Sequence, residues 1–267
     1  MTYTKIAFRV AGGVAEIELA DPPANTYSYE MMREIDDAVL AARMDRAVHV
    51  IVIRGAGGKF FCAGANISTL TQADPDWKYY FCLHANETMN RLEQTPKLVI
   101  AALNGHCVGG GLEVAMAADL RVARKDAGRI GLPEVKLGVL PGTGGTQRLA
   151  RLLGKAKAIE LMATGRLLSF DEARALGLVN EVWGEEELKG RSFADAVLEY
   201  ARTFAPPHTA SRAVGHMKRA VQSGLEAGFH EGLALERELQ QRLFESADAA
   251  EGLRANVEKR APRFEGR

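Results

Sequence analysis

Two glutamates are the candidate proton-transfer residues of this sequence. Glu113 follows Gly109-Gly110-Gly111 with only Leu112 between them, and these glycines would expose backbone amides at the start of a helix. Glu134 follows Pro133 in an apolar context, which predicts partial burial and a raised pKa, as a general acid requires. Each has a plainer explanation: an acid in a first helical turn complements the helix dipole, and Glu134 could be a solvated surface residue.

Backbone N–H groups near these glutamates form a second candidate feature. In the segment 60–67, Gly64 would let a ligand approach the main chain, and Ala65 would present its N–H group, although an ordinary tight turn also explains the glycine. A helix starting near Gly110 would favour a negatively charged ligand. These segments and 130–148 follow apolar, strand-like runs, where ligands bind in α/β folds.

Several other catalytic patterns are absent. Gly111-Leu112 replaces the Lys and Ser/Thr that a phosphate-binding Walker loop needs, and the glycines at 142–145 do not complete GxGxxG. There is no GxSxG elbow, and Ala234 stands where HExxH needs its second histidine. The three cysteines have no CxxC spacing and predict reduced, buried thiols rather than disulfides or zinc. Nucleophilic serine and zinc chemistry are therefore disfavoured.

Composition narrows the class of protein. The 267 residues are 47% hydrophobic and 25% charged, as in folded globular enzymes. Lys plus Arg and Asp plus Glu both number 34, so no net charge favours nucleic acid or an anionic membrane. The segment 1–10 lacks an apolar signal region and no run reaches about 18 apolar residues. These features predict a cytoplasmic protein with neither nucleic-acid nor membrane partners.

The first half of the chain has an α/β pattern. Alternating apolar residues on both sides of Gly12-Gly13 predict a β-hairpin, and Ser28 can cap a helix with apolar residues through Ala42. The β-branched run 48–53 and the run 98–103 predict strands buried on both faces. A helix is expected between them, over 77–93.

The second half is mostly helical. Helices are expected over 146–153 and 155–163, and Ser169 with Glu172 forms a capping box. Pro206-Pro207 separates these from later helices over 208–222, 225–246 and 250–259. We therefore predict an α/β core over 1–205 and a C-terminal helical region over 206–267.

Taken in order, these stretches resemble the enoyl-CoA hydratase/isomerase (crotonase) superfamily over nearly the whole chain. The similarity is strongest at 63–67, 104–113, 133–134 and 141–148. It implies an α/β fold built as a spiral of β-β-α repeats, with C-terminal helices that mediate trimerisation. Trimers of such proteins often pair, so a homotrimer or homohexamer is expected.

The resemblance also implies roles for individual residues. The N–H groups of Ala65 and Gly110 would bind the thioester oxygen of an acyl-CoA as an oxyanion hole. Glu113 would hold and activate a water molecule, which the Gly142 N–H would also bind, and Glu134 would exchange the proton at the α-carbon. Coenzyme A would be part of the substrate, and no separate cofactor is implied.

Contacts to the rest of the substrate are also implied by this match. Near the oxyanion hole they involve four residues, namely Ala63, Asn66, Ile67 and Ser68, of which Asn66 and Ser68 depart from the common family pattern. Phe244 and Lys259 match positions that approach the adenine end, from a neighbouring subunit in similar proteins. The simpler alternative for Lys259 is a solvated residue in a charged run.

The aromatic-rich segment 68–81 corresponds to the variable acyl pocket of the family, or else packs one face of the following helix. His84 and His106 lie in or beside apolar runs and are interpreted as structural. Retention of both Glu113 and Glu134 favours a hydro-lyase that adds water to a trans-2-enoyl-CoA. The alternatives are an isomerase, a thioester hydrolase or decarboxylase of the same fold, or a non-catalytic acyl-CoA-binding subunit.

Overall fold

The computed structural model describes residues 3–267, so Met1 and Thr2, which begin the segment 1–10 and the predicted core 1–205, lie outside it. Within this range a six-stranded sheet has the order β1-β2-β3-β5-β7-β9. The β1–β2 pair is antiparallel and the other pairs are parallel. The strands are β1 (Ile6–Ala11), β2 (Val14–Leu19), β3 (Val50–Gly55), β5 (Leu98–Leu103), β7 (Leu120–Arg124) and β9 (Glu181–Trp183). The predicted hairpin and both predicted buried strands are confirmed, whereas β7 and β9 were not predicted.

The central strands are covered on both faces, as their apolar sequences require. Along β3, Ile51 and Ile53 join the core beneath α1 (Tyr29–Met44), while Val50 and Val52 pack on the face covered by α9 (Phe193–Arg202). Side chains alternate across a strand, so only a continuous apolar run satisfies both faces. Ser28 caps α1 by accepting a hydrogen bond from the Met31 amide, as predicted.

A second, smaller sheet positions the candidate site. It contains β4 (Phe60–Cys62), β6 (His106–Val108) and β8 (Ile130–Gly131), all parallel. Each follows a strand of the large sheet, so β3-β4, β5-β6 and β7-β8 are successive strand pairs, and helices follow each pair. This arrangement confirms the predicted spiral of β-β-α repeats. The helices after these pairs are α2 (Ile67–Gln72), α3 (Pro75–Glu93), α4 (Gly110–Met116), the 3-10 helix η1 (Glu134–Leu137), α5 (Gly145–Leu153) and α6 (Lys155–Thr164).

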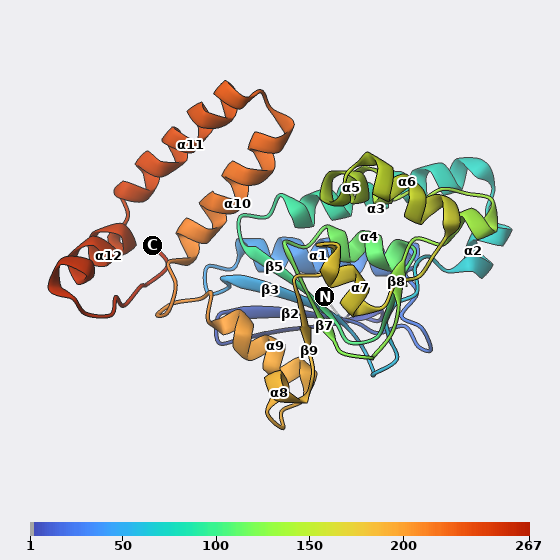
Figure 1. Cartoon of the computed structure of the whole chain (residues 1–267), viewed down its shortest axis with the longest axis horizontal. Helices are drawn as coiled ribbons and strands as arrows, with labels where there is room; N and C mark the ends of the chain where they lie inside the picture. Colours follow the sequence, from blue (N-terminus) through green and yellow to red (C-terminus); the bar gives the residue numbers. More distant parts are fainter. Residues whose placement is uncertain (1–2) are drawn as a thin grey trace.

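The C-terminal part is helical, as expected. It contains α7 (Phe170–Ala175), with the predicted Ser169–Glu172 capping box, then α8 (Glu185–Leu188), α9, α10 (Ser211–Glu226), α11 (Phe229–Phe244) and α12 (Ala247–Glu258). Figure 1 shows α10 and α11 as a hairpin that extends away from the sheets. In residues 3–267 no helix is both long and apolar enough to cross a membrane.

The helical region is attached to the core through α10. The Lys218 ammonium lies 2.8 Å from the Asp119 carboxylate and donates to the Lys97 carbonyl at 3.1 Å. Gly215 faces Pro96 so closely that a β-carbon would lie 2.3 Å from the Pro96 carbonyl oxygen. The predicted boundary at 205/206 falls between α9 and α10, and the division of the chain into two regions there stays a prediction.

Candidate active site

The candidate residues meet because the three small-sheet strands are parallel. Their carboxyl ends lie at one edge of the sheet, which is where ligands bind in α/β folds. β4 leads into Ala63-Gly64-Ala65, β6 into Gly109-Gly110, and β8 into Pro133-Glu134. Segments separated by about seventy residues are thereby placed side by side.

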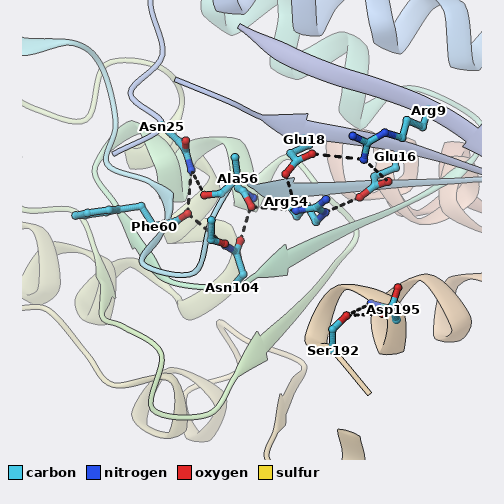
Figure 2. Close-up of polar contacts among 12 residues, drawn as sticks. Arg9, Glu16, Glu18, Asn25, Arg54, Ala56, Phe60, Asn104, Ser192 and Asp195 are labelled. Atoms are coloured by element: carbon cyan, nitrogen blue, oxygen red, sulfur yellow. Dashed lines mark hydrogen bonds and ion pairs between the residues drawn. The ribbon is translucent and has the colours of Figure 1, made fainter. Parts of the chain in front are cut away.

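Two buried asparagines hold the first of these segments. The Asn25 and Asn104 side-chain amides donate to the Phe60 carbonyl, at 3.0 and 3.4 Å, and to carbonyls of the preceding turn. The Asn104 side-chain oxygen, Oδ1, also accepts from the Gly55 amide at 2.9 Å. Figure 2 shows both asparagines converging on Phe60. These bonds hold the start of β4 in place, and they thereby position residues 63–65 at its end.

The Ala65 N–H points away from Tyr27, whose backbone pairs with the residues on either side of Ala65. The Tyr27 amide donates to the Gly64 carbonyl at 3.0 Å, and the Asn66 amide donates to the Tyr27 carbonyl at 3.1 Å. Successive N–H groups of an extended chain point to opposite sides, so the intervening Ala65 N–H is directed elsewhere. Among the described residues, it donates to no protein acceptor.

Gly110 lies beside this loop. A β-carbon on Gly64, whose φ is +87°, would lie 2.9 Å from the Gly110 nitrogen. Gly109 has φ +58°, and this turn lets Gly110 begin α4. The Gly110 amide likewise has no acceptor within residues 3–267. The two amides predicted to form an oxyanion hole therefore lie close together and are both available.

Glu113 is buried and held by three donors. Its Oε1 accepts from the Thr143 and Gly145 amides at 2.8 and 2.7 Å, and its Oε2 accepts from the Thr143 hydroxyl. Burial raises the pKa of Glu113, and these hydrogen bonds oppose that rise. A carboxylate has about four acceptor positions, so one remains on Oε2 for a water molecule.

Glu134 is half-buried at the start of η1, and its Oε2 has no partner among the described residues. Its Oε1 lies 3.0 Å from the position that a β-carbon on Gly109 would occupy, next to the Gly110 amide. Burial, with a smaller contribution from the charge of Glu113, raises its pKa to about 7. A group with this pKa can both donate and accept a proton near neutral pH.

A cavity of about 550 Å³ connects these groups. Seven of the residues predicted for the site line it, namely Ala63, Ala65, Ile67, Gly110, Glu113, Glu134 and Gly142. Asn66 and Ser68 do not: the Asn66 side chain caps α2 and accepts from the Ser68 hydroxyl at 2.6 Å. Phe244 and Lys259 belong to the C-terminal helices and do not line the cavity of their own chain. A role for them in trans stays a prediction.

The aromatic residues of segment 68–81 were predicted either to line the acyl pocket or to pack one face of the following helix, and they do not all behave alike. Phe81 is buried, lines the cavity and stacks on Trp77 with ring centroids 5.2 Å apart. Tyr79 and Tyr80 point outward, each 65% exposed. His106 has a structural role, since its Nδ1 accepts from the Arg129 amide at 3.0 Å.

Two cavity residues escaped the sequence analysis. Tyr27 follows Pro22-Pro23 in a segment without periodicity. Cys82 was predicted to be a buried thiol, which is wrong: it is only half-buried because it lines the cavity, whereas Cys62 and Cys107 are buried as predicted. Tyr27 is buried against Gly110 and its hydroxyl lies 3.1 Å from Thr143 Oγ1. Polar residues surround Tyr27 in the sequence, among them Thr26 and Ser28, so its hydroxyl gave no distinguishing signal.

Known proteins share this architecture. The family model described as enoyl-CoA hydratase/isomerase matches residues 9–267. A short-chain-enoyl-CoA hydratase of Clostridium acetobutylicum is 35% identical over 97% of both chains. A methylglutaconyl-CoA hydratase of Rattus norvegicus is 36% identical over 91% of this chain and 76% of its own. A crystal structure of an enoyl-CoA hydratase from Geobacillus kaustophilus is 42% identical, with a TM-score of 0.94 over 100% of this chain and 98% of that one. This protein belongs to the enoyl-CoA hydratase/isomerase family.

Proposed function

We propose that the protein is an enoyl-CoA hydratase, a hydro-lyase that reversibly adds water to a trans-2-enoyl-CoA to give a 3-hydroxyacyl-CoA. The observation that carries this proposal is the presence of two carboxyl groups, Glu113 and Glu134, in one cavity beside two free amides. Hydration needs one group for the water and one for the α-carbon, so this pair matches the reaction. The names of the relatives support the same activity.

The Ala65 and Gly110 amides would bind the thioester oxygen. Protonation at the carbon beside a thioester passes through an enolate, whose negative charge develops on that oxygen. Preorganised N–H donors stabilise this charge, and loss of one donor typically costs about 10²–10³ in rate. Because both are backbone groups, the fold rather than any side chain maintains them.

The two carboxyl groups would divide the proton transfers. Ionised Glu113 takes a proton from water as the water oxygen bonds to the β-carbon, and protonated Glu134 delivers its proton to the α-carbon. The Gly142 N–H, at the cavity wall, would hold the same water. The reaction adds one water molecule, consumes no net proton and changes no overall oxidation state, so it needs no redox cofactor. Because the two carboxyl groups supply both proton transfers, we also propose that no metal takes part.

An isomerase would share the oxyanion hole but needs only one group to move a proton between carbons. The location of both glutamates in the cavity favours the hydratase. A decarboxylase needs no water-activating group, and a non-catalytic subunit needs neither carboxyl group. A hydrolase also activates water, and its products distinguish it from a hydratase.

The decisive experiment follows the absorbance of the conjugated thioester of crotonyl-CoA with wild type, Glu113→Gln and Glu134→Gln, and identifies products by mass. We expect hydration by wild type and a loss of about 10²–10⁴-fold in either variant. Hydration that survives both substitutions would refute the two-carboxylate mechanism. Absence of hydration of crotonyl-CoA and of longer and branched 2-enoyl thioesters would refute the hydratase assignment.

We also propose that the chain assembles as a homotrimer or homohexamer through its C-terminal helices. Exposed apolar side chains on those helices support this proposal, among them Met217, Val221, Leu225, Phe229 and Leu253. Phe244 and Lys259 would then approach the adenine end of coenzyme A in a neighbouring subunit. Sedimentation that shows a stable monomer would contradict the assembly. The cytoplasmic location stays a prediction, supported by three free cysteines.

A further inference from the structure

The side chain of Tyr27 connects the two halves of the candidate site. Its ring packs against Gly110, where a β-carbon would lie 2.1 Å from the Tyr27 hydroxyl oxygen. Its hydroxyl lies 3.1 Å from Thr143 Oγ1, and the Thr143 hydroxyl in turn donates to Glu113 Oε2. All three residues are buried.

Hydrogen counting fixes the direction of this chain. The Thr143 hydroxyl has a single hydrogen, and that hydrogen is donated to Glu113. Thr143 can therefore only accept from Tyr27, so the tyrosine O–H is the donor at 3.1 Å. Burial raises the pKa of Tyr27 well above its usual value, which keeps this hydrogen in place at neutral pH.

We propose that Tyr27 is a positioning residue, whose hydroxyl orients the Thr143 hydroxyl toward Glu113 and so holds the carboxylate that activates water. Without the tyrosine hydroxyl, the Thr143 hydroxyl loses the donor that polarises it. The Thr143 and Gly145 amides would still hold Oε1, so Glu113 would keep its place while Oε2, the water-facing oxygen, becomes less well fixed. The effect of removing the hydroxyl should therefore fall on kcat.

The backbone of Tyr27 makes a separate set of contacts. The Tyr27 amide and carbonyl bond Gly64 and Asn66, and so direct the Ala65 N–H into the site. A Tyr27→Phe substitution preserves this backbone and the ring while removing only the hydroxyl. It consequently tests the link from the Tyr27 hydroxyl through Thr143 to Glu113, while the backbone bonds that position Ala65 stay in place.

This inference rests on the proposed hydratase function, and its test separates the two. We would compare kcat and KM for crotonyl-CoA hydration in wild type, Tyr27→Phe, Thr143→Val and the double variant. We expect Tyr27→Phe to lower kcat about 3- to 10-fold, the worth of one hydrogen bond, with KM changed less than about twofold. In the Thr143→Val background Tyr27→Phe should have no further effect on kcat, because its hydroxyl acts through Thr143.

The matched control is Tyr3→Phe, which removes a tyrosine hydroxyl bonded to Asp37 at 2.7 Å, away from the cavity. It should leave kcat unchanged. An unchanged kcat in Tyr27→Phe, or an equal loss in both backgrounds, would overturn the proposal.

A second readout is independent of activity. Carboxyl titration by infrared or carbon NMR, assigned with Glu113→Gln, should give a higher pKa for Glu113 in Tyr27→Phe than in wild type. The other groups that act on or titrate near Glu113, which are Glu134, Cys82 and Arg148, are unchanged in these variants. If wild type hydrates no enoyl thioester, the function fails while this titration still decides the inference. An unaltered Glu113 pKa would overturn it.

Discussion

Glu134 Oε1 lies 3.0 Å from the point where a β-carbon on residue 109 would sit, so a side chain there would displace this carboxyl by a few tenths of an ångström. Gly109 also has φ +58° and ψ −134°, a conformation that side chains other than glycine rarely adopt. The backbone conformation at residue 109 thus favours glycine, and the close approach of Glu134 adds a separate effect on the position of the carboxyl. The two effects can be separated by experiment.

We predict that Gly109→Ala lowers the free energy of unfolding by about 1–3 kcal/mol and reduces hydration at least about tenfold. The matched control is Gly57→Ala, where φ is +72° but no atom lies within 4 Å of the added carbon. In this control, backbone strain should lower the free energy of unfolding measured by urea denaturation, while kcat stays at the wild-type value. Equal losses of activity in both variants would show that strain alone matters.

The pH profile of hydration should reflect one proton shared by Glu113 and Glu134. The active form has Glu113 ionised and Glu134 protonated, and Glu134 has a pKa of about 7. We therefore expect kcat/KM to decline above pH about 7, approaching tenfold per pH unit. The apparent values belong to the coupled pair rather than to either residue.

Dehydration of the 3-hydroxyacyl-CoA must show the same dependence of kcat/KM on pH, because the overall reaction consumes no proton. Measurement of both directions from pH 5 to 9 would check this. A flat profile across that range would contradict the assigned protonation states.

Burial of Glu134 should also make stability depend on pH. Its pKa is raised from 4.5 to about 7 on folding, so between these values the folded state holds a proton that the unfolded state has lost. Stability from this group is therefore present below pH 4.5 and is lost as pH rises to about 7.

Glu134→Gln removes this ionisation. The difference in free energy of unfolding between variant and wild type should therefore favour the variant more at pH 8 than at pH 5. Because Glu134 is only half-buried and lines the cavity, we expect about 1–2 kcal/mol rather than the full linkage value. Chemical denaturation at the two pH values, with the exposed Glu236→Gln as control, measures the difference. A gain of the same size at both pH values would argue that Glu134 ionises normally.

The Lys218–Asp119 pair should determine how firmly α10 is attached to the core. Burial raises the pKa of Asp119 and lowers the pKa of Lys218, and each partner opposes the shift of the other. Lys218→Met would leave a buried carboxylate without its cation, which costs about 3–5 kcal/mol. Gln222→Ala, which removes only the 3.2 Å bond to Asp119, should cost about 1 kcal/mol.

Urea denaturation of the variants would test this prediction. A loss below about 1 kcal/mol for Lys218→Met would mean that packing around Gly215, rather than the ion pair, holds the helix.

Elements with strong local signals could be predicted before the fold was known. Period-two alternation gave the β1–β2 hairpin, continuous apolar runs gave β3 and β5, and serine caps gave the starts of α1 and α7. Glu113 and Glu134 could also be named as candidate proton-transfer residues. A carboxylate beside glycines or in an apolar run indicates such a role before any partner residue is known. The motifs around them were dense enough to indicate the family.

The tertiary structure alone decided which distant residues complete the site. β9 and the strands of the small sheet are only two or three residues long, too short for periodicity to distinguish them from loops. Tyr27 and Thr143 are 116 positions apart and meet only because Tyr27 pairs with the loop after β4 while α5 approaches α4. The raised pKa of Glu134 likewise depends on how much water the assembled cavity admits. Local sequence encodes the conformation of each segment, but burial and long-range hydrogen bonds exist only after the chain has folded.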